Sequence, residues 1–128
     1  MKYEIFLSDR KTYLHIRVNE PVTSELLNDF IGETAKKANE CRIDNFLFDL
    51  RNASNRADIT DHYVMVNKQS QKLGFKSLSK HALLIRQKDI DDYSFVETIL
   101  NITGYQSKMF TDELSAIEWL EKLTPSNN

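Results

Sequence analysis

Hydrophobic and polar residues alternate in two short segments at the start of the chain. Every second residue is apolar from Tyr3 to Leu7 and again from Leu14 to Val18. This period of two is typical of β-strands that have one covered face. The polar run between the two segments, Ser8 to Lys11, indicates a turn. We therefore predict an antiparallel hairpin, which Pro21 ends because it cannot donate a ladder hydrogen bond.

Two segments in the first half of the chain have the spacing of amphipathic helices. Thr23 is placed to cap the first one, whose apolar residues recur up to Ala38. The second runs from about Asp58 to Leu73, and Gly74 then suits the end of a helix. The apolar stripe of this second helix consists of Ile59, Tyr63, Val66 and Leu73, and Ser70 interrupts it.

Two more helices are expected in the second half. Asp91 or Ser94 begins the third helix, with Ser94 and Glu97 matching a capping box, and Gly104 ends it. Thr111 is expected to cap the fourth helix. Its inward-facing residues are predicted to be Leu114, Ile117, Leu120 and Leu123, with Trp119 at the border of the buried face.

Two further segments are apolar without alternation, from Phe46 to Leu50 and from His81 to Ile85. Such runs are typical of strands buried on both faces of a parallel sheet. A shorter, partly polar run that ends at Phe110 suits an edge strand. The order β-β-α-β-α-β-α-β-α predicts a single-domain α/β fold with a mixed, mostly parallel five-stranded sheet and four helices. We expect this domain to span residues 1–124, with residues 125–128 as a flexible tail.

Composition and charge narrow the class of protein. The chain has 128 residues, of which 41% are hydrophobic and 28% charged, as is ordinary for one globular domain. Its net charge of −2 argues against nucleic-acid binding, which needs a basic surface. The single cysteine, Cys41, excludes an intrachain disulfide. No apolar run approaches the roughly 20 residues that span a bilayer. Since the chain opens without a secretory signal pattern, we expect a cytoplasmic protein.

The polar loop after the Phe46–Leu50 strand is the strongest candidate for recognition, because loops in this position often carry binding groups. Its polar residues are Arg51, Asn52, Ser54, Asn55 and Arg56. The two arginines suit an anionic group or an acidic protein surface, although a solvated loop has the same composition. Asp58, Thr60 and Asp61 follow at the helix start, where they either bind a partner or cap the helix. Thr60 is also a candidate phosphoacceptor, and Ser54 is a second hydroxyl nearby.

No set of residues points to catalysis or to a cofactor. Asp58 and His62 are four apart and suit an acid–base pair, but a surface ion pair explains the same spacing. No nucleophile accompanies them. The histidines lack metal-ligand spacing, and the glycines form no phosphate-binding motif. We therefore predict a non-enzymatic protein without a metal or other cofactor. One set of apolar residues suits either core packing or the wall of a ligand cleft: Tyr63, Val66, Phe95, Ile99 and Leu100.

Three local patterns, together with the element order, resemble a known family. They are Phe46-Leu47-Phe48-Asp49-Leu50 before a polar loop and a helix, a short strand after Gly104 that ends in Met109-Phe110, and Ala116-Ile117-Glu118-Trp119-Leu120 near the end. In these respects the chain is similar to the STAS (anti-sigma-factor antagonist) domain, and more narrowly to its SpoIIAA-like branch. The likeness extends over nearly the whole chain.

The resemblance implies a cytoplasmic binding or regulatory module that works through contact with a protein partner. The same branch is also likened to CRAL-TRIO-type carriers, so the alternative is a carrier or sensor of an apolar small molecule. Family members that switch partners by phosphorylation resemble Asp-Ser-Ser-Gly at the loop-to-helix junction, where this chain has Ala57-Asp58-Ile59-Thr60. Thr60 is the only hydroxyl in that stretch, and Asp58 and Asp61 add negative charge beside it. Trp119 is a candidate contact in a homodimer.

Overall fold

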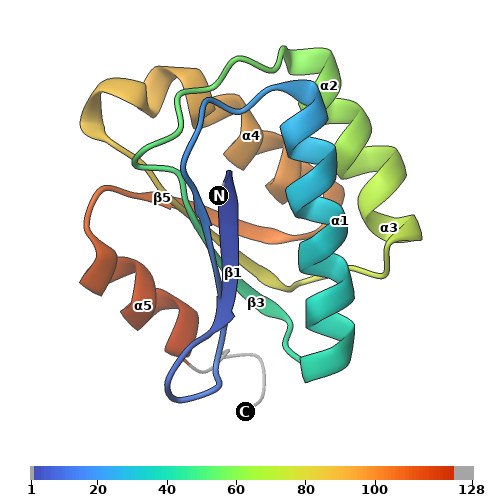
Figure 1. Ribbon diagram of the computed structural model, residues 1–128, viewed down its shortest axis with the longest axis vertical. Helices are drawn as coiled ribbons and strands as arrows, with labels where there is room; N and C mark the ends of the chain where they lie inside the picture. The colour runs from blue at the N-terminus through green and yellow to red at the C-terminus, as the bar shows by residue number, and fades with distance from the viewer. Residues whose placement is uncertain (1, 123–128) are drawn as a thin grey trace.

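Five strands form one sheet in the order in which they occur along the chain (Figure 1). The computed structural model describes residues 2–122. The strands are β1 (Tyr3–Leu7), β2 (Leu14–Val18), β3 (Asn45–Asp49), β4 (Lys80–Leu84) and β5 (Gln106–Phe110). β1 and β2 are antiparallel, and all later neighbours are parallel. Phe46 lies directly beside His81, so the predicted parallel pairing of the two central strands is confirmed. The predicted tail, residues 125–128, and the domain end at residue 124 lie outside the described residues.

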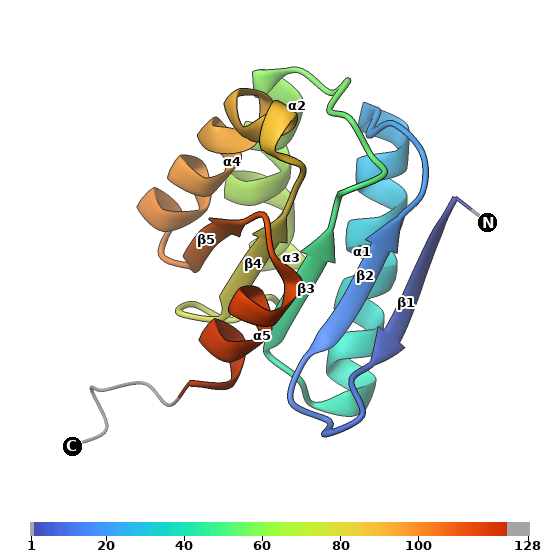
Figure 2. The same cartoon turned by 90° about the vertical axis from the view of Figure 1, so that its left-hand side faces the viewer.

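The helical segments lie on both faces of the sheet (Figures 1 and 2). The segments are α1 (Ser24–Cys41), α2 (Ile59–Val64), the π-helical turn η1 (Met65–Gln69), α3 (Ser70–Lys72), the 3₁₀ turn η2 (Gln87–Asp89), α4 (Ile90–Thr103) and α5 (Glu113–Glu121). α1, the continuous segment α2–η1–α3, and α4 cover one face, which we call the α1 face. α5 covers the other, the α5 face. The predicted α/β fold, with a mostly parallel five-stranded sheet and four helical regions, is confirmed.

Alternation along the central strands divides the core into two layers. Phe46 and Phe48 of β3 pack with the α1-face cluster, while Leu47 between them packs with the α5-face cluster. In β4, Leu83 and Leu84 divide between the two layers in the same way. All residues of β4 are buried, which explains why its sequence shows no polar alternation.

Several expected helix details are correct and others are wrong. Thr23 does cap α1, because its hydroxyl accepts a hydrogen bond from the Leu26 amide at 3.2 Å. α4 begins at Ile90, directly after η2, so neither Asp91 nor Ser94 starts it. The cap of α5 is Asp112 and not Thr111, since the Asp112 carboxylate accepts from the Ser115 amide at 2.9 Å.

The predicted inner face of α5 is also partly wrong. Ala116 and Leu120, four residues apart, pack against the sheet, and Leu114 is 70% exposed. Leu123 lies outside the described residues.

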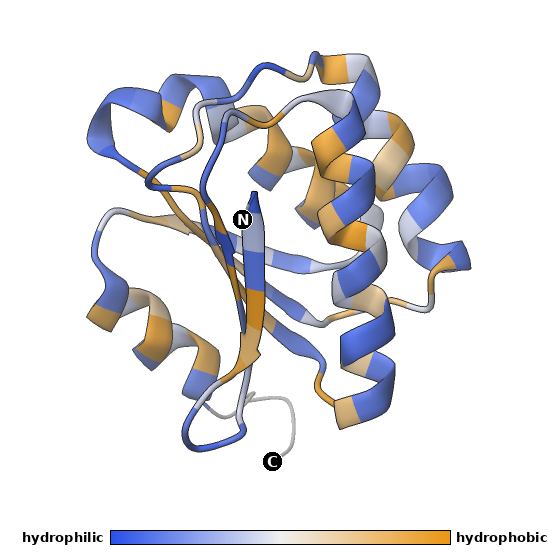
Figure 3. Cartoon of the chain, viewed as in Figure 1, coloured by the Kyte–Doolittle hydropathy of each residue, from blue (hydrophilic) through white to orange (hydrophobic). Residues whose placement is uncertain are grey.

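Figure 3 shows that hydrophilic and hydrophobic residues alternate along the helices. Within residues 2–122, no helix has both the length and the apolar character needed to cross a membrane.

Candidate functional site

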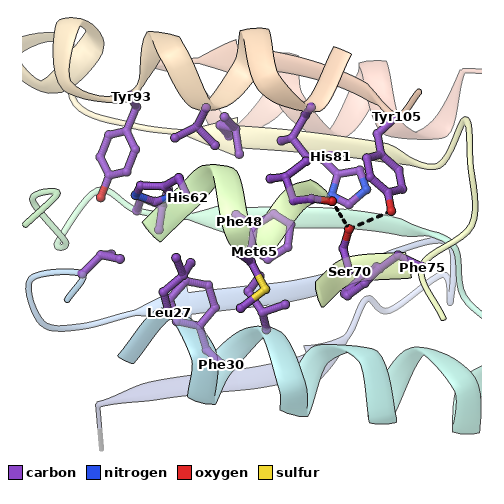
Figure 4. Close-up of a pocket in the computed structure, with 17 residues that line it drawn as sticks. Leu27, Phe30, Phe48, His62, Met65, Ser70, Phe75, His81, Tyr93 and Tyr105 are labelled. Atoms are coloured by element: carbon purple, nitrogen blue, oxygen red, sulfur yellow. Dashed lines mark hydrogen bonds between the residues drawn. The ribbon is translucent and has the colours of Figure 1, made fainter. Parts of the chain in front are cut away.

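A cavity of about 70 Å³ lies on the α1 face, between the sheet and its covering helices (Figure 4). Its lining residues are Val22, Leu27, Phe30, Ile31, Phe48, Leu50, His62, Met65, Val66, Ser70, Phe75, His81, Leu83, Tyr93, Val96, Leu100 and Tyr105. Val66 and Leu100 of the predicted apolar cleft belong to this lining, whereas Tyr63, Phe95 and Ile99 do not. The lining contains no aspartate, glutamate, lysine or arginine. Its two histidines have lowered pKa values and are neutral at pH 7.

The segment α2–η1–α3 forms one wall of the cavity. Its inward residues are His62, Met65, Val66 and Ser70. Ile59 and Tyr63, which the periodicity placed on the buried stripe, are 62% and 51% exposed. The inward face thus keeps Val66 of the predicted stripe, but His62 takes the core position that Tyr63 was expected to occupy. The π-helical turn also departs from the regular period on which the prediction rested, and such turns occur frequently at functional sites.

At one end of the cavity, two hydroxyl groups bond to each other. Ser70 Oγ lies 2.6 Å from the carbonyl oxygen of Val66 and 2.8 Å from the hydroxyl of Tyr105. A carbonyl only accepts, so the Ser70 hydroxyl donates to Val66 and the Tyr105 hydroxyl donates to Ser70. Both hydroxyl hydrogens are therefore committed within the protein.

His62 closes the other end of the cavity and is 4% exposed, so the expected surface pair with Asp58 is wrong. Its Nε2 lies 2.9 Å from Asn55 Oδ1, which also accepts from the amide of Ala57. Because Asn55 Oδ1 is an acceptor, Nε2 carries the proton. Burial lowers the pKa of His62 to about 4, with Asp61 and Asp58 opposing the shift, so the ring is neutral at pH 7.

The remaining polar groups of the lining are also paired. Tyr93 donates its hydroxyl to the carbonyl of Ala53, and burial raises the pKa of Tyr93 above its usual range. His81 Nε2 lies 2.9 Å from Ser79 Oγ, and the ring stacks on Phe48 at 5.9 Å between centroids. Burial lowers the pKa of His81 to about 3. The cavity thus suits an uncharged, apolar occupant, since a buried carboxylate or ammonium would find no counter-charge.

The predicted recognition loop lies beside this cavity and is fixed to the rest of the molecule. The backbone of the loop bridges to Val22, whose amide donates to Ser54 and whose carbonyl accepts from Arg56. Asn55 donates to the Asp92 carbonyl at 3.4 Å while it accepts from His62. The loop therefore connects the end of the cavity to α4.

The guanidinium of Arg51 is paired with two carboxylates on the α5 face. It donates to Asp49 at 2.8 and 2.9 Å and to Glu113 at 2.8 Å. Asp49 also lies 3.1 Å from Nε2 of His15. Burial alone would raise the pKa of Asp49, but hydrogen bonds from Arg51 and His15 outweigh it and hold that pKa well below its usual range. Arg51 thus links the end of β3 to the start of α5.

Asp58 and Asp61 form a reciprocal capping box at the start of α2. The Asp58 carboxylate accepts from the Asp61 amide at 3.0 Å, and Asp61 accepts from the Asp58 amide at 3.2 Å. Asn52, Arg56 and Thr60 are exposed, and Ser54 is half-buried. The side chains of Asn52, Arg56 and Thr60 therefore face solvent, where a partner could contact them. Thr60 remains a predicted phosphoacceptor, flanked by the two capping carboxylates.

Sequence reasoning missed most of the polar residues around the cavity. Ser70 left a signal, since it interrupts an apolar stripe, but Tyr105 and His81 lie in strand-like contexts that give no sign of an inward role.

Within residues 2–122, no group of three or more His, Cys, Asp or Glu side chains is placed to hold a metal ion.

A scan against models of known protein families finds no match, and a search of curated proteins finds none either. A search of solved structures does find similar chains. One is the crystal structure of a protein from Shewanella loihica PV-4, described as a member of the DUF3478 family with a SpoIIAA-like fold. It matches with a TM-score of 0.60 and 17% sequence identity, covering 92% of this chain and 91% of the other. At this identity the match establishes the fold, which is SpoIIAA-like as the sequence predicted.

Proposed function

We propose that this SpoIIAA-like domain is a non-enzymatic binding module for a small, uncharged, mainly apolar molecule, which it carries or senses. The observation that carries the proposal is the cavity on the α1 face, whose polar groups are paired within the protein. Ligand sites are typically concave, largely apolar and preformed. A cytoplasmic location remains part of the proposal.

The size of the cavity limits the ligand. A cavity of about 150 Å³ lined by apolar side chains binds benzene in another protein, and the present cavity has about 70 Å³. It therefore holds a few heavy atoms as it stands, and a single ring requires the wall to move outward. Met65 and the π-helical turn supply an adaptable wall, because methionine repacks easily and the turn is not a regular helix.

Toluene and benzoate test the proposal directly, because they share a ring and differ in charge. Titration of toluene, followed by NMR of methyl groups, should shift signals from Met65, Val66 and Leu100 in a saturable way. Benzoate should not shift them. If toluene left these methyl groups unchanged, or shifted Leu47 and Leu120 on the α5 face instead, the cavity would not be the binding site. Native mass spectrometry of protein purified from cells should in addition show a bound apolar compound.

Two valine variants on the same segment provide a matched pair. Val66→Phe places a ring into the cavity and should weaken toluene binding at least tenfold. Val64→Phe adds the same bulk two residues earlier, at a partly exposed position outside the lining, and should leave binding unchanged. Equal loss in both variants would indicate a general disturbance of the helix and would count against the cavity as the site.

A second candidate function is contact with a protein partner, favoured by the exposed outer face of α2. Ile59 and Tyr63 are 62% and 51% exposed there, next to the exposed side chains of Arg56 and Thr60. Since the inner face of the same segment lines the cavity, a partner at this surface could respond to the ligand. Alanine at Ile59 and Arg56 should weaken capture of a regulatory partner, and Ile102→Ala, at an 80% exposed position on α4, is the control. A partner that bound all three variants equally would exclude this surface.

A further inference from the structure

The two edges of the sheet differ in how their backbone groups are satisfied. At the β5 edge, side chains of α4 cover the outward groups. The Ser107 amide donates to Asn101 Oδ1 and the Met109 amide to Glu97 Oε2, both at 2.8 Å. Asn101 also donates to the Ser107 carbonyl at 3.3 Å. Covering an edge in this way prevents another strand from pairing with it.

The β1 edge has no such cover among the described residues. The Asn19 amide donates to the Lys2 carbonyl and the Ser8 amide to the Tyr13 carbonyl, which fixes the phase of the antiparallel ladder. Because hydrogen-bonded pairs alternate along such a ladder, Lys2, Glu4, Phe6 and Ser8 direct their backbone groups to β2. Tyr3, Ile5 and Leu7 therefore direct their amides and carbonyls outward. Figure 2 shows β1 as the outermost strand on that side.

We propose that β1 pairs antiparallel with β1 of a second copy of this chain, which joins the two sheets into one. A two-fold axis through Ile5 places Ile5 opposite Ile5 of the second copy and Tyr3 opposite Leu7. Every outward amide and carbonyl from Tyr3 to Leu7 then meets an outward group of the other copy. Symmetric pairing of identical surfaces is the usual way in which homodimers close.

The side chains of β1 also match those of a second copy. On the α1 face the opposed pairs are all apolar, which favours cross-strand packing. On the α5 face Glu4 lies opposite Phe6 and Lys2 opposite Ser8, so no like charges lie directly opposite each other. The two Glu4 side chains become diagonal neighbours across the axis, and each has Arg17 of its own copy beside it at 3.7 Å. Phe6 is 38% exposed and Arg17 stacks on it at 5.3 Å, while Arg17 also lies 3.7 Å from Glu4. Phe6 of the second copy would extend this cluster. An acidic or basic peptide would lack this match.

A cysteine placed on the axis tests the register. In a Cys41→Ser background, which removes the sole native cysteine, Ile5→Cys should be linked into a dimer by a short thiol-to-thiol crosslinker such as bis(maleimido)ethane. Directly opposed residues in an antiparallel pair have Cβ atoms about 4.5–5.5 Å apart, which is wider than the roughly 3.5–4.5 Å that a disulfide requires but well within the reach of a short crosslinker. Lys2→Cys is the matched control on the same strand. In this register residue 2 of one copy lies opposite residue 8 of the other. At about 3.4 Å per residue, the two substituted positions of the control are therefore about 20 Å apart, and the control variant should stay uncrosslinked.

Sedimentation equilibrium tests the assembly without engineered cysteines. The unmodified chain should be a dimer, and Ile5→Pro should shift it to monomer. Proline removes only an outward amide there, so the β1–β2 ladder keeps its hydrogen bonds. The proposal is overturned by a monomer at all concentrations, by a dimer that persists in Ile5→Pro while Ile5→Cys fails to crosslink, or by a monomer that binds a foreign peptide along β1. Ligand binding in the cavity is not involved, so the two proposals can fail separately.

Discussion

His62 and His81 are buried as neutral rings, and this makes the protein sensitive to acid. Burial lowers the pKa of His62 to about 4 and that of His81 to about 3, from an ordinary value of 6.5. The unfolded chain therefore binds protons before the folded one does. The stability that the neutral rings contribute is fully present above about pH 6.5. It is lost as the pH falls through about 4 for His62 and about 3 for His81.

Urea unfolding at pH 7, 6 and 5 measures this loss. Each histidine should contribute a slope of about 1.4 kcal/mol per pH unit within that window. His62→Gln, which keeps a donor for Asn55, should remove about half of the slope. The carboxylate of Asp49, whose pKa lies well below its usual range, contributes only at lower pH. A free energy of unfolding that stayed constant between pH 7 and 5 would show that the two rings are not buried in the neutral form.

Leu84 and Leu114 give a direct test of which leucines form the α5-face layer. Leu84 is fully buried in β4, so Leu84→Ala should lower the free energy of unfolding by about 2–5 kcal/mol. Leu114 is 70% exposed, so Leu114→Ala should change it by no more than about 0.5 kcal/mol. Chemical denaturation of both variants measures the difference. Similar losses in the two would restore the inward position that helical spacing assigned to Leu114.

At the level of whole elements, the sequence predicted the sheet well because its signals are local. Alternation marked β1 and β2, and unbroken apolar runs marked β3 and β4, which lie side by side as expected. Helix detail was less predictable, because several residues compete for each role. Asp112 caps α5 one residue after Thr111. His62 is buried although a polar residue at a helix start normally indicates solvent, and its partner Asn55 lies seven residues away in the loop.

The candidate site was only partly predictable for a related reason. The cavity depends on how three helices and two strands pack at a distance, and no local pattern encodes the space that remains between them. The loop from Arg51 to Asp61 lies next to it, and the role of this loop as a contact surface stays a prediction. Its arginine at position 51, however, bonds to Asp49 and Glu113, and this pairing depends on α5, which is far along the chain.

In the π-helical turn the hydrogen bonds span five residues instead of the four of an α-helix, which accommodates one extra residue in the segment and shapes the cavity wall. Deletion of Lys68, an exposed residue within the turn, should allow a regular α-helix through this segment. The far-ultraviolet circular dichroism should then keep its helical signal, while toluene binding weakens at least tenfold. Lys68→Ala keeps the residue count and should bind as the unmodified chain does. Normal binding by the deletion variant would mean that the turn has no part in the cavity.

Across the whole molecule, the two faces of the sheet are closed in different ways. On the α5 face, Arg51 joins the start of α5 to β3, and the Lys80 ammonium donates to the Trp119 and Lys122 carbonyls at 2.9 and 2.7 Å at its end. α5 is thus fixed at both ends. On the α1 face, α1, the segment α2–η1–α3 and α4 enclose the cavity, and the second of these contains an irregular turn. Mobility related to ligand binding is therefore expected on the α1 face.

Hydrogen exchange with and without toluene tests this division between the faces. A ligand that binds only the folded state stabilises it by about 2.7 kcal/mol at one hundred times its dissociation constant. Amides that exchange through global unfolding should slow equally everywhere, whereas those that exchange through local opening should slow only where the ligand contacts the wall. We expect added protection in the α2–η1–α3 segment and none beyond the global effect in α5. Benzoate is the control and should protect neither. Greater protection of α5 than of the η1 wall would place the binding site on the opposite face of the sheet, because only a contact made there could hold α5 closed against local opening.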